Sequence, residues 1–363
     1  MQGEFLMSQG NYALAILEFQ EAIALDPNAS TIHVAIADGY IKLGKLKRSE
    51  THLKIAIELD PDETEGLDML GQIYFSQKRH NDAQQIYKRL HTTDPDNLDY
   101  IFILADLHRI QKNWDSSIDY YMLAYNVNTL AIKGLEQALQ IALSTNKLKR
   151  AEEICELMHN DAPDNLDILN TYKDLTLYNK NYKKSLDLLE KIEKQTGVTN
   201  ELLLQKSALY EELNQKELAL EVVLMAHEND SLNIDILHRI VSVLMDQNQN
   251  EEAIKYNYKI TKNHPNDPRG FINNAIMAMS SKKPEQAIKA LQPHVSKFFS
   301  DFTIQYLLGT AYYQTNDFDN AERHLAQALE IYPQSRNTKH NLALIYDSMG
   351  EWNLSDQLYI ELI

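Results

Sequence analysis

The chain has 363 residues, a net charge of −17, one cysteine and nine prolines, and 44% of its residues are hydrophobic, which is enough for a folded core. The acidic balance argues against binding to nucleic acids or anionic membranes, because both are polyanions. A single cysteine excludes a disulfide framework and a multi-cysteine zinc site, and no apolar run approaches the roughly 18 residues of a membrane span.

The prolines reveal a repeat. Six of them are separated by multiples of 34 residues: Pro27, Pro61, Pro95, Pro163, Pro265 and Pro333. A 34-residue register with proline at position 32 divides the whole chain without an insertion. In chain order the repeats are 1–29 (partial), 30–63, 64–97, 98–131, 132–165, 166–199, 200–233, 234–267, 268–301, 302–335 and 336–363 (partial). We therefore predict a single domain over 1–363 with about eleven repeats.

Two columns of small residues support this register. Position 20 is Ala or Ser in all eleven repeats: Ala15, Ser49, Ala83, Ser117, Ala151, Ser185, Ala219, Ala253, Ala287, Ala321 and Ser355. Position 8 is Gly, Ala or Ser in eight repeats: Gly3, Ala37, Gly71, Ala105, Ser207, Ala275, Gly309 and Ala343. Position 24 is apolar in every repeat except one, where it is Asn257.

These columns predict two helices in each repeat. Apolar residues at positions 4, 7 and 11 lie on one face of a first helix, and positions 20, 24 and 27 lie on one face of a second helix. Two helices approach closely only where the side chains at their crossing are small, which accounts for positions 8 and 20. Proline at position 32 ends the second helix. The predicted fold class is all-α.

The pattern resembles the tetratricopeptide repeat, in its multi-repeat solenoid form of bacterial type. The residues that carry the resemblance are Gly10, Asn11, Tyr12, Ala15, Phe19, Ala22, Asp26 and Pro27 near the N-terminus, and Gly309, Tyr312, Asp317, Phe318, Ala321, Ala328 and Pro333 near the C-terminus. The resemblance implies a right-handed α-solenoid, or superhelix. It also implies that the first helices line a concave groove and the second helices face outward.

The repeat 268–301 departs most from the pattern. Pro284 is expected at the start of its second helix, and Pro293 should end or kink that helix. Residues 251–300 carry eight Lys or Arg and four acidic residues, a local charge of +4 in an acidic chain. One interpretation is a variable surface with one short helix, and the other is a docking site for an acidic partner.

The chain offers no pattern typical of an enzyme. It has no phosphate-binding loop, dinucleotide motif, nucleophile elbow or histidine pair spaced for a metal. Cys155, His33, His108 and His294 occupy packing columns, so we interpret them as structural. We expect no catalytic residue, no cofactor and no metal.

The groove is the expected partner-binding surface. Positions 2, 5, 9, 12 and 13 of each first helix point into it by helical spacing and by the resemblance. This surface is mostly acidic in repeats 30–131 and more apolar in repeats 234–335. The predicted partner-binding residues are Asp38, Asp68, Gln72, Asp106, Arg109, Asp174, Tyr178, Arg239, Met279, Tyr306 and Tyr313. For each of them taken singly, the competing interpretation is a solvated surface.

The leading functional hypothesis is a non-catalytic scaffold that binds an extended peptide or partner proteins, with basic and apolar segments in the ligand. The alternative is a regulatory or substrate-recruiting region of a larger multidomain enzyme or assembly. The family's mode of gripping a C-terminal carboxylate requires Asn in the groove, and position 9 has none in its first six repeats. The incomplete first and last repeats suggest either a piece of a longer protein or end-to-end self-association. Nothing decides between cytoplasm and periplasm, and the cytoplasm is slightly favoured.

Overall fold

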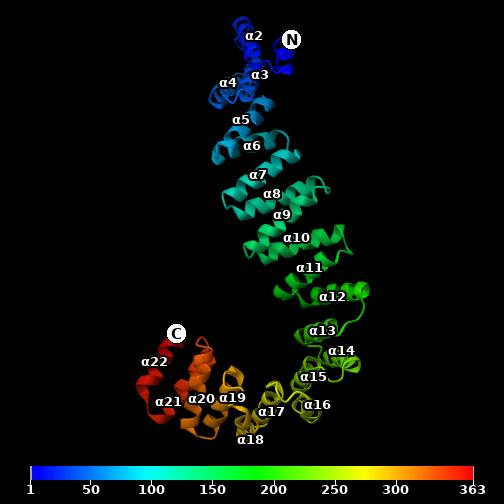
Figure 1. Cartoon of the computed structure of the whole chain (residues 1–363), viewed down its shortest axis with the longest axis vertical. Coiled ribbons are helices and arrows are strands. Elements are labelled where there is room, and N and C mark those ends of the chain that lie inside the picture. Colours follow the sequence, from blue (N-terminus) through cyan, green and yellow to red (C-terminus); the bar gives the residue numbers. More distant parts are fainter. Residues whose placement is uncertain (1, 363) are drawn as a thin grey trace. The chain divides into compact units, whose positions relative to one another are not determined.

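The computed structural model describes residues 2–362, which contain α-helices, one short 3₁₀ helix and no strand. The chain divides into an N-terminal unit, Met1–Lys180, and a C-terminal unit, Asn181–Ile363. Within each unit, helices that follow one another in the chain pack side by side (Figure 1). First helices of successive repeats also touch, as α3 does with α5 and α15 with α17. The prediction of an all-α solenoid is thereby confirmed.

The helices of the N-terminal unit are α1 (Gln2–Ser8), α2 (Tyr12–Leu25), α3 (Ser30–Lys42), α4 (Leu46–Leu59), α5 (Thr64–Ser76), α6 (His80–Thr93), α7 (Leu98–Ile110), α8 (Trp114–Val127), α9 (Ile132–Ser144), α10 (Leu148–Asp161) and α11 (Leu166–Tyr178). Those of the C-terminal unit are α12 (Tyr182–Thr196), α13 (Asn200–Glu212), α14 (Lys216–Asn229), α15 (Ile234–Asp246), α16 (Asn250–Asn263), α17 (Arg269–Ser280), α18 (Pro284–Leu291), η1 (Gln292–His294), α19 (Phe302–Gln314), α20 (Phe318–Ile331), α21 (Arg336–Met349) and α22 (Trp352–Leu362). From α3 onward, first helices begin every 34 residues, with a one-residue shift at Arg269. The single domain over the whole chain stays a prediction.

The small residues of position 20 lie where the two helices of a repeat cross. All eleven are at most 1% exposed, as the sequence predicts. Position 8 faces the same crossing from the first helix. A methyl group added at Gly71 would lie 2.8 Å from the Tyr87 ring, and one at Gly309 would lie 2.6 Å from Leu325. At these two glycines the crossing therefore leaves no room for a larger side chain on the first helix.

The turn between the two helices of a repeat has the same backbone conformation throughout. Position 15 has a positive φ in all eleven repeats: Gly10, Gly44, Lys78, Lys112, Asn146, Lys180, Asn214, Asn248, Lys282, Asn316 and Gly350. In the repeat 64–97, the amide of Arg79 donates to the Tyr74 carbonyl at 2.9 Å and that of Lys78 to the Phe75 carbonyl at 3.0 Å. This pair of hydrogen bonds is the Schellman motif, which ends a helix and reverses the chain.

The repeat 268–301 has a shortened second helix, as its prolines predict. α18 begins at Pro284 and ends at Leu291, two residues before Pro293. A 3₁₀ turn and irregular turns follow up to residue 300. His294 packs in this segment with its ring stacked on Phe271, and the ring centroids are 3.7 Å apart. The expected packing role of His294 is confirmed.

The single polar residue of the position 24 column is held by a buried amide network. Asn257 is 1% exposed. Its Nδ2 donates to the Gly270 carbonyl and to Asn274 Oδ1, both at 2.8 Å. Its Oδ1 accepts a hydrogen bond of 2.9 Å from Nδ2 of Asn273, which is 3% exposed. The break in the column is therefore compensated by partners on α17.

Two histidines form a partly buried pair in the N-terminal unit. Nδ1 of His33 on α3 lies 3.1 Å from Nδ1 of His52 on α4, so one ring donates and the other accepts. Burial lowers the pKa of both rings below the ordinary 6.5, and the nearby His33 lowers the pKa of His52 further. His33 and His108 are each 7% exposed, which confirms their expected structural role.

Replacing Ala83 with Leu should force the crossing of α5 and α6 apart, because position 20 has no free space. We expect a loss of about 1–3 kcal/mol in the free energy of unfolding, measured by denaturant titration. Gln85→Leu adds an apolar side chain to an exposed site of the same helix and should change stability much less. An Ala83→Leu variant as stable as the parent chain would show that the helix register is wrong.

Asn257→Leu tests the amide network against the column pattern. Leucine restores the apolar column but leaves the Gly270 carbonyl and the Asn273 amide without their partner. We expect destabilisation by about 1–3 kcal/mol in thermal or denaturant unfolding. Because Asn257→Leu/Asn273→Leu removes two members of the network together, the double variant should recover part of the loss. A gain in stability from Asn257→Leu alone would refute the network.

The histidine pair predicts a pH dependence with a definite sign. Both rings bind a proton more readily in the unfolded chain, so their stabilising contribution is full above about pH 6.5 and declines as the pH falls. Replacing both His33 and His52 with Phe should reduce the drop in unfolding temperature between about pH 7.5 and about pH 5.5. His340→Phe, at an exposed histidine, serves as the control. An equal drop in the parent chain and the double variant would contradict this assignment.

Candidate functional site

An open hollow of about 360 Å³ lies between the first helices α5 and α7 of the N-terminal unit. The residues that line it are Asp68, Gln72, Asn97, Asp99, Tyr100, Phe102, Ile103 and Asp106. Three of them, Asp68, Gln72 and Asp106, were predicted as partner-binding residues. They occupy positions 5 and 9, which helical spacing places on one face of consecutive first helices. None of the lining residues is basic.

Asp68 is held in place by two neighbours. Gln72, one turn later on α5, donates from Nε2 to Asp68 Oδ2 at 2.9 Å. Tyr87 of α6 donates from its hydroxyl to Asp68 Oδ1 at 3.1 Å. Burial raises the pKa of Tyr87, and the Asp68 charge raises it further, so this hydroxyl stays a donor. The two bonds fix the carboxylate while leaving it part of its accepting capacity.

Asp106 has a similar arrangement and an additional cation. Tyr121 of α8 donates its hydroxyl proton to Asp106 Oδ1 at 2.8 Å, and burial raises the pKa of Tyr121 to about 12. Arg109 donates to the same oxygen from Nη2 at 2.6 Å. The predicted site residue Arg109 is thus paired with Asp106 on the same helix, α7. Its positive charge offsets the negative charge that Asp106 presents to the hollow. The side chain of Arg109 is 45% exposed.

The remaining predicted residues of this unit lie outside the hollow. Asp38 on α3 forms a long contact of 4.0 Å with Lys42 Nζ. Asp174 on α11 lies 3.1 Å from Lys173 Nζ. Tyr178 is 66% exposed at the end of α11. The structure therefore places these three on first helices without bringing them into one cavity.

In the C-terminal unit, the predicted residues are engaged within the protein. Nε of Arg239 donates to Ser207 Oγ at 3.0 Å, and its Nη2 forms an ion pair of 2.6 Å with Glu211. Tyr306 stacks on Phe302 and accepts a hydrogen bond of 3.2 Å from Asn341.

Two further predicted residues of this unit are partly buried. Met279 packs against the core of α17–α19. Tyr313 packs against the core around α20 and α21.

Some lining residues were absent from the predicted set. Tyr100, Phe102 and Ile103 form the apolar part of the hollow on α7. Asn97 caps this helix by accepting hydrogen bonds from the amides of Asp99 and Tyr100. The signal that could have found them is the pairing of consecutive first helices, which places positions 5 and 9 of one repeat beside positions 2 to 6 of the next.

The single cysteine is a packing residue, as the sequence predicts. Cys155 is 1% exposed, and burial raises the pKa of its thiol to about 12, which confirms it as a core residue. Among residues 2–362, no three His, Cys, Asp or Glu side chains gather closely enough to hold a metal ion. No helix in the described part of the chain has the length and apolar character needed to cross a bilayer.

Comparison with known proteins identifies the repeat. Tetratricopeptide repeat family models match residues 6–73, 64–97 and 302–335. Hsp70-Hsp90 organizing protein 3 of Arabidopsis thaliana is 32% identical over 100 residues, which cover 28% of this chain and 18% of that protein. The anaphase-promoting complex subunit CDC16 of Saccharomyces cerevisiae is 23% identical over 289 residues, 78% of this chain and 34% of that protein.

The chain spans about a third or less of the length of the curated relatives that it matches. A solved structure of Naa15/Naa10 bound to HypK-THB superposes with a TM-score of 0.45 and 13% identity, covering 99% of this chain and 62% of that one. The predicted bacterial type stays a prediction. The three family matches, together with the helix pairs and their small-residue crossings, show that the chain belongs to the tetratricopeptide repeat family.

Proposed function

We propose that the chain is a non-catalytic scaffold that binds an extended, basic segment of a partner protein across the first helices of repeats 30–131. The observation that carries this proposal is the hollow between α5 and α7, which is lined by three carboxylates and no cation. Membership in a family of helical repeats supports the class of function, because such repeats present extended binding surfaces. The relatives named for organizing Hsp70 and Hsp90 and for the anaphase-promoting complex support protein partners.

The composition of the hollow favours a basic side chain with an apolar stem. Asp68 and Asp106 offer oxygen acceptors, while Tyr100, Phe102 and Ile103 offer a surface for methylene groups. A guanidinium or ammonium group can pair with the carboxylates and lie against an aromatic ring. A C-terminal carboxylate would instead be repelled by the acidic residues, which argues against the chaperone-tail mode of the family.

Two further parts of the proposal rest on the sequence pattern. The apolar part of the ligand would contact repeats 234–335 near Met279, Tyr306 and Tyr313, each of which keeps some exposed surface. The alternative, a substrate-recruiting region of a larger enzyme or assembly, is supported by the likeness to a subunit of a multiprotein complex. End-to-end self-association stays a prediction.

Neutralising Asp68 and Asp106 tests the proposed groove. The probe is a fluorescein-labelled decapeptide that alternates lysine with alanine, titrated against the full chain by fluorescence anisotropy. Asp68→Asn/Asp106→Asn should raise the Kd by about threefold to tenfold, because two exposed charge pairs are lost. The dependence of the Kd on salt should also become shallower.

The control variant removes the same charge elsewhere. Asp62 and Asp96 are exposed residues of the turns between repeats and do not line the hollow. Asp62→Asn/Asp96→Asn should therefore change the Kd by less than about twofold. Equal effects of the two double variants would mean that net charge, and not this hollow, attracts the peptide, and the proposal would fail.

A further inference from the structure

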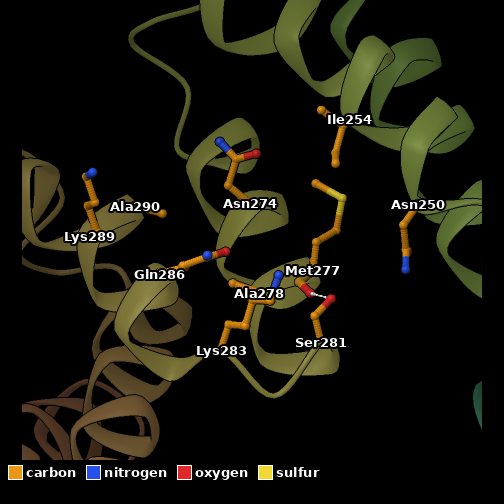
Figure 2. Close-up of a pocket in the computed structure, with 10 residues that line it drawn as sticks. All are labelled: Asn250, Ile254, Asn274, Met277, Ala278, Ser281, Lys283, Gln286, Lys289 and Ala290. Atoms are coloured by element: carbon orange, nitrogen blue, oxygen red, sulfur yellow. Dashed lines mark hydrogen bonds between the residues drawn. The ribbon is translucent and has the colours of Figure 1, made fainter.

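A second hollow, of about 420 Å³, lies in the C-terminal unit between α16, α17 and α18 (Figure 2). Its lining residues are Asn250, Ile254, Asn274, Met277, Ala278, Ser281, Lys283, Gln286, Lys289 and Ala290. Its lining residues come from the second helices α16 and α18 and from the first helix α17, and none of them lines the acidic hollow between α5 and α7. It belongs to the repeat with the shortened second helix.

The equivalent place in the repeat 64–97 is filled by the protein itself. Tyr74 stands 204 residues, or six repeats, before Ala278, and it is only 6% exposed. The guanidinium carbon of Arg79 lies 4.0 Å from the centroid of the Tyr74 ring. Arg79 also forms ion pairs with Glu50 at 3.0 Å and with Asp82 at 2.8 Å. An aromatic ring, a cation over it and two carboxylates complete this part of the repeat.

The repeat 268–301 keeps the cation and lacks the other three groups. Lys283 stands where Arg79 stands, while the ring of Tyr74 is replaced by Ala278. The carboxylates of Glu50 and Asp82 are replaced by Ile254 and Gln286. The hollow is therefore the volume that a tyrosine occupies in five other repeats: Tyr40, Tyr74, Tyr210, Tyr312 and Tyr346.

The surface of the hollow is apolar at its base and basic at its rim. Met277 and Ala278 form the base and are 6% and 8% exposed. Figure 2 shows Met277 extending from α17 toward Ile254 of α16, whose side chain is 53% exposed. Lys283 and Lys289 are exposed at the rim, and neither ammonium group is paired with a carboxylate in the described structure. They belong to the stretch 251–300, with its local charge of +4.

We propose that this hollow binds an aromatic side chain flanked by acidic residues, presented by a partner polypeptide. The ring would lie on Met277 and Ala278 beneath Lys283, as the Tyr74 ring lies beneath Arg79. The flanking carboxylates would pair with Lys283 and Lys289, in place of the acidic residues that this repeat has lost. The chain thus carries a second protein-binding surface of opposite charge preference to the acidic hollow, and each can be tested without the other.

The test uses methyl NMR of the full chain labelled at the methionine ε-methyl groups, with the Met277 signal assigned through Met277→Leu. The probe is the acetylated, amidated peptide Glu-Glu-Tyr-Glu-Glu. Stacking of the ring on Met277 should shift that signal in a saturable way. Peptides in which Leu replaces Tyr, or Lys replaces each Glu, should produce at most a small fraction of the shift.

Two variants of the chain decide whether the hollow is responsible. Ala278→Tyr fills the site with the residue of the other repeats and should abolish the peptide-induced change in the Met277 signal. Lys283→Gln should raise the Kd by about fivefold, because the cation over the ring is lost. Lys282→Gln removes the same charge one residue away and should change the Kd by less than about twofold, because Lys282 does not line the hollow.

A Met277 signal that does not move, or that moves equally with the leucine peptide, would overturn the proposal. Equal Kd values for Lys283→Gln and Lys282→Gln would overturn it as well. Circular dichroism checks that Ala278→Tyr is folded. If that variant does not fold, the comparison of Lys283→Gln with Lys282→Gln still shows whether the hollow binds the peptide.

Discussion

In every repeat, the first and second helices come close enough that position 20 accommodates only alanine or serine. This close approach sets the positions of the larger side chains around it, as Tyr87 covers Gly71 and Leu325 covers Gly309. At one serine of this column the hydroxyl finds a partner across the crossing, where Ser117 Oγ donates to the Ala105 carbonyl at 2.9 Å. Since the same contact recurs, a given position of the repeat occupies the same place in each copy. An unusual residue in one column therefore produces a local and predictable change.

Much of the fold follows from the sequence, because packing columns are visible in it. The 34-residue spacing predicted where the first helices begin, and Pro293 predicted the early end of α18. The left-handed residue at position 15 was not predicted, because lysine, asparagine and glycine all occupy it. That conformation is fixed by backbone hydrogen bonds that close the helix, and these need no particular side chain. Asn257 stood out as a break in its column, yet its partners became visible only once α16 and α17 were packed together.

Less of the candidate site than of the fold could be predicted from the sequence. Helical spacing placed Asp68, Gln72 and Asp106 on one surface, and the structure brings them together. Spacing could not show that Arg109 pairs with Asp106, or that Arg239 is engaged by Glu211 and Ser207, because long side chains choose among several neighbours in three dimensions. The hollow beside Ala278 was likewise missed. Position 11 is tyrosine in five repeats and alanine at Ala278, and this difference is visible in the sequence. The tyrosines at this position were interpreted only as core residues, so the space left by the alanine was overlooked.

The chain thus presents an acidic hollow between the first helices α5 and α7 and a second hollow with a basic rim between α16, α17 and α18. At the second hollow, Ala278 stands where five other repeats have tyrosine. The most direct measurement of this account is the unfolding temperature of Ala278→Tyr compared with Ala142→Tyr. Ala142 occupies the same position of the repeat 132–165 and is completely buried. We predict that Ala278→Tyr unfolds at the same or a higher temperature than the parent chain, while Ala142→Tyr unfolds at a lower one. A comparable loss of stability in both variants would contradict the account.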